Sequence, residues 1–166
     1  RNCPHFGICG GCSYLDKDYE DVLKIKEERV KSLIDAALEN DDKTNIVPGY
    51  EWEGIKPSPA IYGYRNKMEF SFGDEVKGGP LTLGLHKKKS FHDIIDADGC
   101  VICDDDFTKI LTTVKEYCTI NDWHFYNKMN HIGYMRHLLI RKGSHTGEIL
   151  VALVTTSQVE PDLSPL

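Results

Sequence analysis

The spacing of apolar residues switches between a helical and a strand period along the chain, and this order constrains the fold more than any other feature. Apolar residues recur at helical spacing over 15–38 and 104–119, which predicts two amphipathic helices. They alternate with polar residues within 60–96 and 131–156, and glycine-rich turns divide both segments, which predicts two β-hairpins. Helix, hairpin, helix, hairpin is the pattern of an α+β domain, with an antiparallel sheet built from two hairpins and the two main helices packed against it.

Individual positions refine these elements. Met68, Phe70 and Phe72 share one face of the first predicted strand, so we expect them to face the core. Asp16 is the expected N-cap of the first helix, and the acidic run 104–106 suits the start of the second, since helix N-termini favour aspartate. Residues 90–95 predict a short third strand beside the first hairpin.

The length and charge of the chain limit its class. We expect one domain over 1–156, followed by a linker over 157–166, where two prolines interrupt any periodicity. No apolar run reaches the ~20 residues of a membrane span and no secretory signal is visible, so we expect a cytoplasmic protein without a membrane partner. The formal net charge of −6 argues against unspecific adhesion to nucleic acid but allows a local basic face. The chain lacks an initiator Met, so we expect a fragment of a longer protein.

The segment "CPHFGICGGC" makes residues 1–14 a cysteine-rich loop. Cys3, Cys9 and Cys12 lie within ten residues, interspersed with glycines that let the backbone wrap tightly. In a chain without a secretory signal, such thiols indicate metal binding rather than disulfides. A tetrahedral thiolate site needs a fourth ligand, and the candidates are Cys100 and Cys103.

Spacing alone leaves three interpretations open. An iron–sulfur cluster would use the three loop cysteines and either Cys100 or Cys103. A structural zinc site would use the two C-x2-C pairs, Cys9/Cys12 and Cys100/Cys103, and leave Cys3 spare. The third interpretation is unligated thiols, or disulfides formed by oxidation. His5, inside the loop, is a minor candidate for orienting or replacing a ligand.

The same segment resembles the cluster motif of the RumA-type RNA (uracil-5)-methyltransferases, which modify 23S ribosomal RNA. The resemblance continues, in the same order, through "YGYRNKMEFSF" at 62–72, "HDIIDADGCVIC" at 92–103, and "MRHLLIRKG" with "TGEILVALVT" within 135–155. It implies a [4Fe-4S] cluster on Cys3, Cys9, Cys12 and Cys100, with Cys103 as a bystander or a substitute ligand.

By the same resemblance, the parent protein would be a monomer that transfers a methyl group from S-adenosylmethionine to C5 of a uridine in 23S rRNA. No G-x-G-x-G follows a strand in this chain, and the family places its nucleophile and base in a separate domain. We therefore expect no catalytic or S-adenosylmethionine-binding residue here and no activity of the fragment alone. The alternatives are a non-catalytic zinc- or cluster-bearing module for nucleic acids, or a redox sensor in which Cys100 and Cys103 form a switchable pair.

Basic residues in the strands and turns are the candidates for RNA contact, since phosphates attract Lys and Arg. They are Arg65, Lys67, Lys87, Lys88, Lys89, Arg136 and Arg141. Arg136 shares a predicted strand face with Leu138 and Ile140, so it either pairs with a carboxylate in the core or contacts RNA.

Five other residues are expected to serve the core rather than a site. His137 is expected to be a hydrogen-bonded core residue, and Cys118 a buried thiol on the apolar stripe of its helix. Trp123 and Phe125, followed by Tyr126, are expected to close the core rather than stack on bases.

Overall fold

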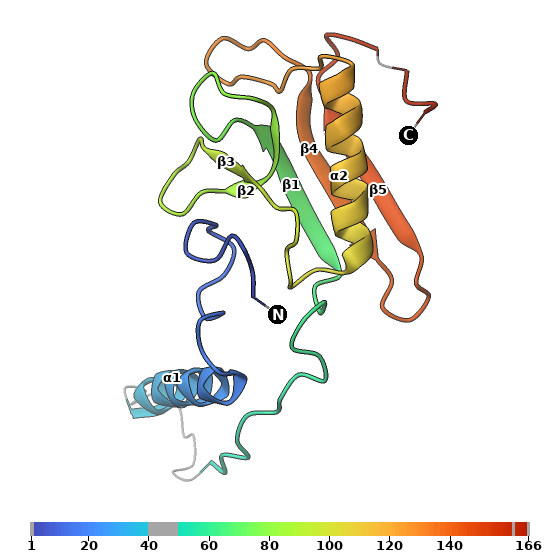
Figure 1. Ribbon diagram of the computed structural model, residues 1–166. Helices are drawn as coiled ribbons and strands as arrows, with labels where there is room; N and C mark the ends of the chain where they lie inside the picture. The colour runs from blue at the N-terminus through green and yellow to red at the C-terminus, as the bar shows by residue number, and fades with distance from the viewer. Residues whose placement is uncertain (1, 40–49, 161, 166) are drawn as a thin grey trace. The chain divides into compact units, whose positions relative to one another are not determined.

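The computed structural model of the chain describes residues 2–39, 50–160 and 162–165. The chain forms two compact units: one contains Arg1–Ser13 and Tyr62–Leu166, and the other contains Tyr14–Ile61. Figure 1 shows both. The expected single domain over 1–156 stays a prediction, and the two units are described separately.

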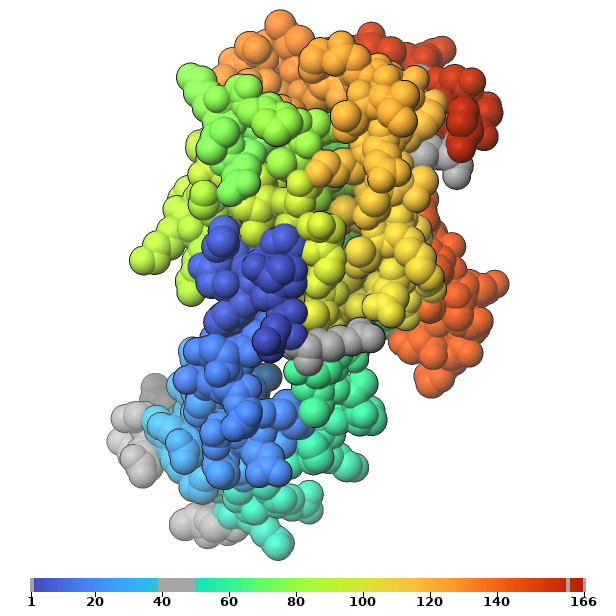
Figure 2. All heavy atoms as spheres, viewed as in Figure 1, coloured from blue at the N-terminus to red at the C-terminus, as the bar shows by residue number. Residues whose placement is uncertain are grey.

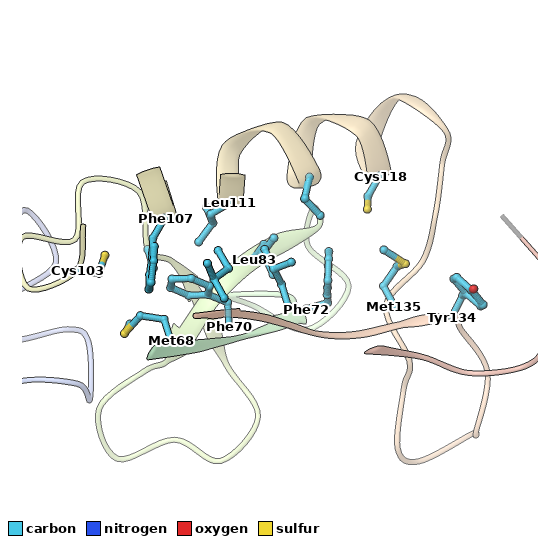
Figure 3. Packing of buried hydrophobic residues seen from close by; sticks show 14 residues of the cluster. Met68, Phe70, Phe72, Leu83, Cys103, Phe107, Leu111, Cys118, Tyr134 and Met135 are labelled. Carbon is cyan, nitrogen blue, oxygen red and sulfur yellow. The ribbon is translucent and has the colours of Figure 1, made fainter. Parts of the chain in front are cut away.

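The larger unit is built on a five-stranded antiparallel sheet with the strand order β3-β2-β1-β4-β5. One helix, α2, lies across one face of this sheet, as Figures 1 and 3 show. The elements are β1 (Lys67–Gly73), β2 (Thr82–His86), β3 (Ile94–Asp96), α2 (Asp105–Ile120), β4 (Met135–Lys142) and β5 (Ile149–Thr155). The α+β class is confirmed. The third strand predicted over 90–95 is present as β3, but it begins only at Ile94.

The core lies between the sheet and α2. Met68, Phe70 and Phe72 of β1 are buried, as their alternation predicts. Phe107 and Leu111 of α2 pack onto the same face of the sheet (Figure 3). Trp123 and Phe125, which follow α2, are partly buried against this core, so their predicted role is confirmed. Tyr126, predicted with them, is not part of this core, and its ring lies under Arg136 instead.

The N-terminus of α2 is held by side chains from its own first turn and from β4. Asp104 is the N-cap, and its carboxylate accepts a hydrogen bond from the backbone N–H of Asp106 at 3.0 Å. The Nζ of Lys142 lies 2.8 Å from Asp104 Oδ2 and 2.9 Å from Asp106 Oδ2. Hydrogen bonds from Lys142 and Lys109 hold the pKa of Asp106 below its usual value.

Replacing Lys142 with methionine is therefore expected to lower stability most at neutral pH. The pKa of Asp106 is lower in the folded state than in the unfolded state. The ion pair of Asp106 with Lys142 therefore adds to the free energy of unfolding above the unfolded-state pKa of Asp106. This stabilisation is lost as the pH falls through the folded-state pKa. The difference in unfolding free energy between wild type and Lys142→Met should shrink below about pH 4. Urea unfolding of both proteins at a series of pH values from 2 to 8 measures this difference. Lys109→Met, which removes a more exposed partner of Asp106, should have a smaller effect. Parallel pH profiles for wild type and Lys142→Met would contradict the prediction.

A β-bulge in β4 corrects the predicted position of Arg136. The register shifts between Met135 and His137, so that Met135 and Leu138 are both buried although three positions separate them. The bulge turns Arg136 out of the core. On the surface, its guanidinium lies 5.0 Å from the ring centroid of Tyr126. The alternative of a buried pair with a carboxylate is therefore wrong.

The smaller unit contains α1 (Tyr19–Glu39) and the segment that returns from it. The predicted N-cap at Asp16 is wrong, because the first backbone hydrogen bond of the helix runs from the N–H of Val22 to the carbonyl of Asp18. Trp52 Nε1 donates to Glu27 at 2.8 Å, which ties the returning segment to the helix. Since α1 belongs to this unit, its expected packing on the sheet stays a prediction.

The predicted linker makes specific contacts at its beginning. The side chain of Gln158 donates to the carbonyl of His131 at 2.8 Å and accepts from the N–H of Gly133 at 3.2 Å. Within the described ranges, no helix combines the length and apolarity that crossing a bilayer requires.

Candidate functional site

The cysteine-rich loop is docked by its backbone on the turn that follows β2. We call residues 3–12 the thiol loop. The N–H of Gly10 donates to the carbonyl of His86 at 3.0 Å, and the N–H of Lys88 donates to the carbonyl of Ile8 at 2.7 Å. In Figure 2 the N-terminal segment (dark blue) lies against the yellow-green surface of this region. A Cβ on Gly10 would lie 3.2 Å from the His86 carbonyl oxygen, so glycine allows this close approach.

A second contact joins the thiol loop to the turn that carries Cys100. His5 Nε2 lies 2.6 Å from the backbone carbonyl oxygen of Asp98 and 3.2 Å from its carboxylate Oδ1. Next to it, a Cβ on Gly99 would lie 3.6 Å from the ring of Pro4, so the two turns are in direct contact. Segments about 90 residues apart in sequence are thus brought together.

This docking makes neighbours of the four cysteines that the family resemblance selects. Cys3, Cys9, Cys12 and Cys100 are all free and half-buried. Burial raises the pKa of Cys9 and of Cys12, and the negative charges of the nearby Cys100 and Cys3 thiolates raise both further. The N–H of Gly11 lies 3.2 Å from Cys9 Sγ, so a backbone donor points at this sulfur.

Cys103 differs from these four. Its side chain is 1% exposed and belongs to the hydrophobic core, and its sulfur lies 3.4 Å from the Cys100 carbonyl oxygen. Hydrogen bonding from the Cys103 thiol lowers the pKa of Cys100 to about 6, whereas the same bond and burial raise the pKa of Cys103. The arrangement favours a thiolate on Cys100 and a protonated thiol on Cys103.

Among the residues that the structure describes, no three His, Cys, Asp or Glu side chains are arranged to hold a metal ion. The four half-buried thiols are thus neighbours without forming a closed coordination shell. Cys118 is fully buried under α2 (Figure 3), and burial raises its pKa to about 12. Its predicted role as a core thiol is confirmed.

The basic candidates fall into three places. Arg65 is exposed and lies close enough to Cys12 to lower the pKa of that thiol slightly, and the 87–89 turn is paired with the thiol loop. Lys67 and Arg141 are direct neighbours across β1 and β4. Arg136 lies apart from both, on the Tyr126 ring.

Two of these basic residues already pair with carboxylates, and a histidine lies on the same sheet. Lys67 and Lys87 already pair with Glu69 and Glu75, at 3.1 and 3.7 Å. His137 lies 3.3 Å from the Ser71 hydroxyl, and burial lowers its pKa. It is half-buried and pairs with Ser71, whose neighbours Phe70 and Phe72 face the core, so the expected hydrogen bond is present but the expected place in the core is wrong.

Sequence reasoning missed two features of this site. One is the double contact of His5 with Asp98, for which the only signal was a histidine inside a loop of thiols and glycines. The other is the nearness of Tyr64 to Cys12: burial and this thiol both raise the pKa of Tyr64. Tyr64 and Arg65 therefore both lie near Cys12.

Comparison with known proteins places the chain beside RNA methyltransferases. No protein-family model matches it. It is 50% identical over 165 residues to an uncharacterized RNA methyltransferase of Clostridium acetobutylicum, covering 99% of this chain and 34% of the relative. A corresponding protein of Caldanaerobacter subterraneus is 44% identical (95% and 33% covered), and one of Thermotoga maritima 33% identical (96% and 33% covered). The chain therefore spans about a third of the length of these curated relatives.

A solved structure shares the fold. The tRNA (uracil-54, C5)-methyltransferase of Pyrococcus abyssi, in complex with S-adenosyl-L-homocysteine, matches with a TM-score of 0.70 at 23% identity. The match covers 98% of this chain and 35% of that one. At this identity the likeness establishes a common fold.

Proposed function

We propose that this chain is the cluster-binding part of an S-adenosylmethionine-dependent RNA (uracil-5)-methyltransferase of the RumA type. The observation that carries the proposal is the gathering of Cys3, Cys9, Cys12 and Cys100 in a chain that aligns over nearly its whole length with RNA methyltransferases. The fold that the chain shares with a uracil-5 methyltransferase supports C5 of uracil as the atom that would be methylated.

The four half-buried thiols would hold a [4Fe-4S] cluster. The Gly11 N–H that points at the Cys9 sulfur is the kind of donor that tunes cluster sulfur. The thiol of Cys103 lies against backbone and core, which supports Cys100 as the fourth ligand. When bound, the cluster would supply four metal–thiolate bonds that crosslink the thiol loop to the Cys100 turn.

The surface around the thiol loop would contact the RNA. Tyr64 is 54% exposed although it borders Cys12, so its ring is available for stacking, and Arg65 beside it supplies a cation for phosphate. Lys88 and Lys89 are exposed on the turn that holds the thiol loop. Lys67, Lys87, Arg136 and Arg141 complete the proposed basic set.

Methyl transfer would take place in the remainder of the parent protein. Attack on C6 of the uracil needs a nucleophile, and removal of the C5 proton needs a base. Cys118 and Cys103, the two cysteines outside the quartet, are buried core thiols and suit neither role. The proposed parent acts as a monomer on 23S rRNA.

The test is a methyl-transfer assay with the complete parent polypeptide and with residues 1–166 alone. With labelled S-adenosylmethionine and 23S rRNA, the complete protein should produce 5-methyluridine, and residues 1–166 should bind RNA without producing it. Product from the complete protein at a base other than uracil, or none on any RNA, would contradict the proposal.

A further inference from the structure

The side chain of His5, which is not a thiol, makes two polar contacts from the thiol loop to the Cys100 turn. We propose that His5 is a positioning residue that holds the two turns together, so that the polypeptide gathers the four thiols before any cluster binds. The docking itself is a property of this chain; its consequence for the cluster rests on the proposed function.

The contact joins the two segments that carry the proposed ligands, close to a cysteine on each side. His5 lies two residues after Cys3, and its Nε2–H donates to the carbonyl oxygen of Asp98, two residues before Cys100. The Asp98 carboxylate lies 3.2 Å from the same nitrogen and adds a second acceptor. The His5 side chain is 23% exposed, so water competes with this bond only in part.

The backbone of the loop transmits the position of His5 to the next cysteine. The His5 carbonyl accepts the N–H of Cys9 at 2.8 Å, which closes a turn between the two residues. Immediately afterwards Gly10 and Lys88 dock the loop on the turn after β2. The loop is therefore fastened at two points: at its beginning to the Cys100 turn, and at 8–10 to the 86–88 turn.

Fastening of this kind lowers the entropic cost of closing the site. Cys12 and Cys100 are separated by about 90 residues, and holding such distant segments together opposes the loop-closure entropy of the chain. A site that is already gathered binds its ligand more tightly and releases it more slowly, because the ordering cost does not fall on the binding step. Groups that orient metal ligands typically affect metal retention by about 10- to 100-fold.

The first measurement is amide hydrogen exchange on iron-free residues 1–166. His5→Ala should reduce the protection of the Cys9 and Gly10 amides about tenfold, while amides of β1 and β4 keep theirs and so show that the core is folded. His5→Gln should retain most of the protection, because its side-chain amide carries a donor nitrogen at a comparable reach. His92→Ala, at an exposed histidine of the same unit, is the matched control and should behave as wild type.

The second measurement is the rate at which an iron chelator removes iron from anaerobically reconstituted protein. His5→Ala should lose iron at least about tenfold faster than wild type, with His5→Gln and His92→Ala close to wild type. Unchanged protection at Cys9 and Gly10 in iron-free His5→Ala would overturn the inference. Lost protection in a chain that takes up no iron in any variant would support the docking role of His5 and overturn the proposed cluster instead.

Discussion

Replacing Cys100 with serine is expected to reduce the iron of anaerobically purified protein from about four atoms per chain, with about four sulfides, to a small residual fraction. The three remaining thiols lie on one short loop, and without Cys100 no thiolate bond would join a cluster on that loop to the Cys100 turn. The lost crosslink spans about 90 residues, so unfolding of the loaded protein should become easier by about 4.6 kcal/mol on the chain-entropy scale. Iron and sulfide analysis and urea denaturation of loaded and chelated protein measure both effects.

Cys103→Ala is the matched control for this variant. Cys103 lies three residues away, and its thiol packs into the core and donates to the Cys100 carbonyl. Its removal should leave most of the iron in place, even though the hydrogen bonding that lowers the pKa of Cys100 is lost. Loss of iron from Cys103→Ala and not from Cys100→Ser would show that the fourth ligand is Cys103. One zinc per chain in place of iron would support the interaction module, and reversible oxidation of Cys100 with Cys103 in an iron-free chain would support the redox sensor.

Truncating Phe107 to alanine is expected to destabilise the larger unit by about 3–5 kcal/mol. Phe107 is 0% exposed in the first turns of α2 and packs onto the buried face of β1 and β4 (Figure 3). Removing the ring costs the transfer free energy of its atoms and leaves a cavity that the rigid sheet cannot fill. The midpoint of urea unfolding, followed by circular dichroism, measures the change.

Phe91→Ala provides the matched control, because the same atoms are removed from a side chain that is 89% exposed. Its effect should stay within about 0.5 kcal/mol of wild type. Similar losses in both variants would mean that α2 does not rest on the sheet through Phe107.

The local elements could be predicted because short-range periodicity encodes them. The alternation of Met68, Phe70 and Phe72 specifies which face of β1 is buried, and the acidic residues 104–106 mark the start of α2. The helical stripe of α2 was sufficient to identify Cys118 as a core thiol. Each of these features depends on residues a few positions apart, which the chain places on one face whatever the rest of the fold does.

Other features depended on tertiary structure. The bulge in β4 reverses the side on which Arg136 lies, and strict alternation carries no sign of it. In the sequence, Asp16 and Asp18 are equally good candidates for the cap of the first helix. The helix begins at Tyr19, directly after Asp18.

The amino-acid sequence by itself determined the order of helices and strands, the buried face of β1 and the presence of a thiol-rich loop. Only the tertiary structure decided that His5 meets Asp98, that Cys100 borders the loop cysteines, and that Cys103 turns into the core. The reason is physical: periodicity acts between neighbours in the chain, whereas contacts across about 90 residues exist only after the sheet and α2 have packed and brought their turns together.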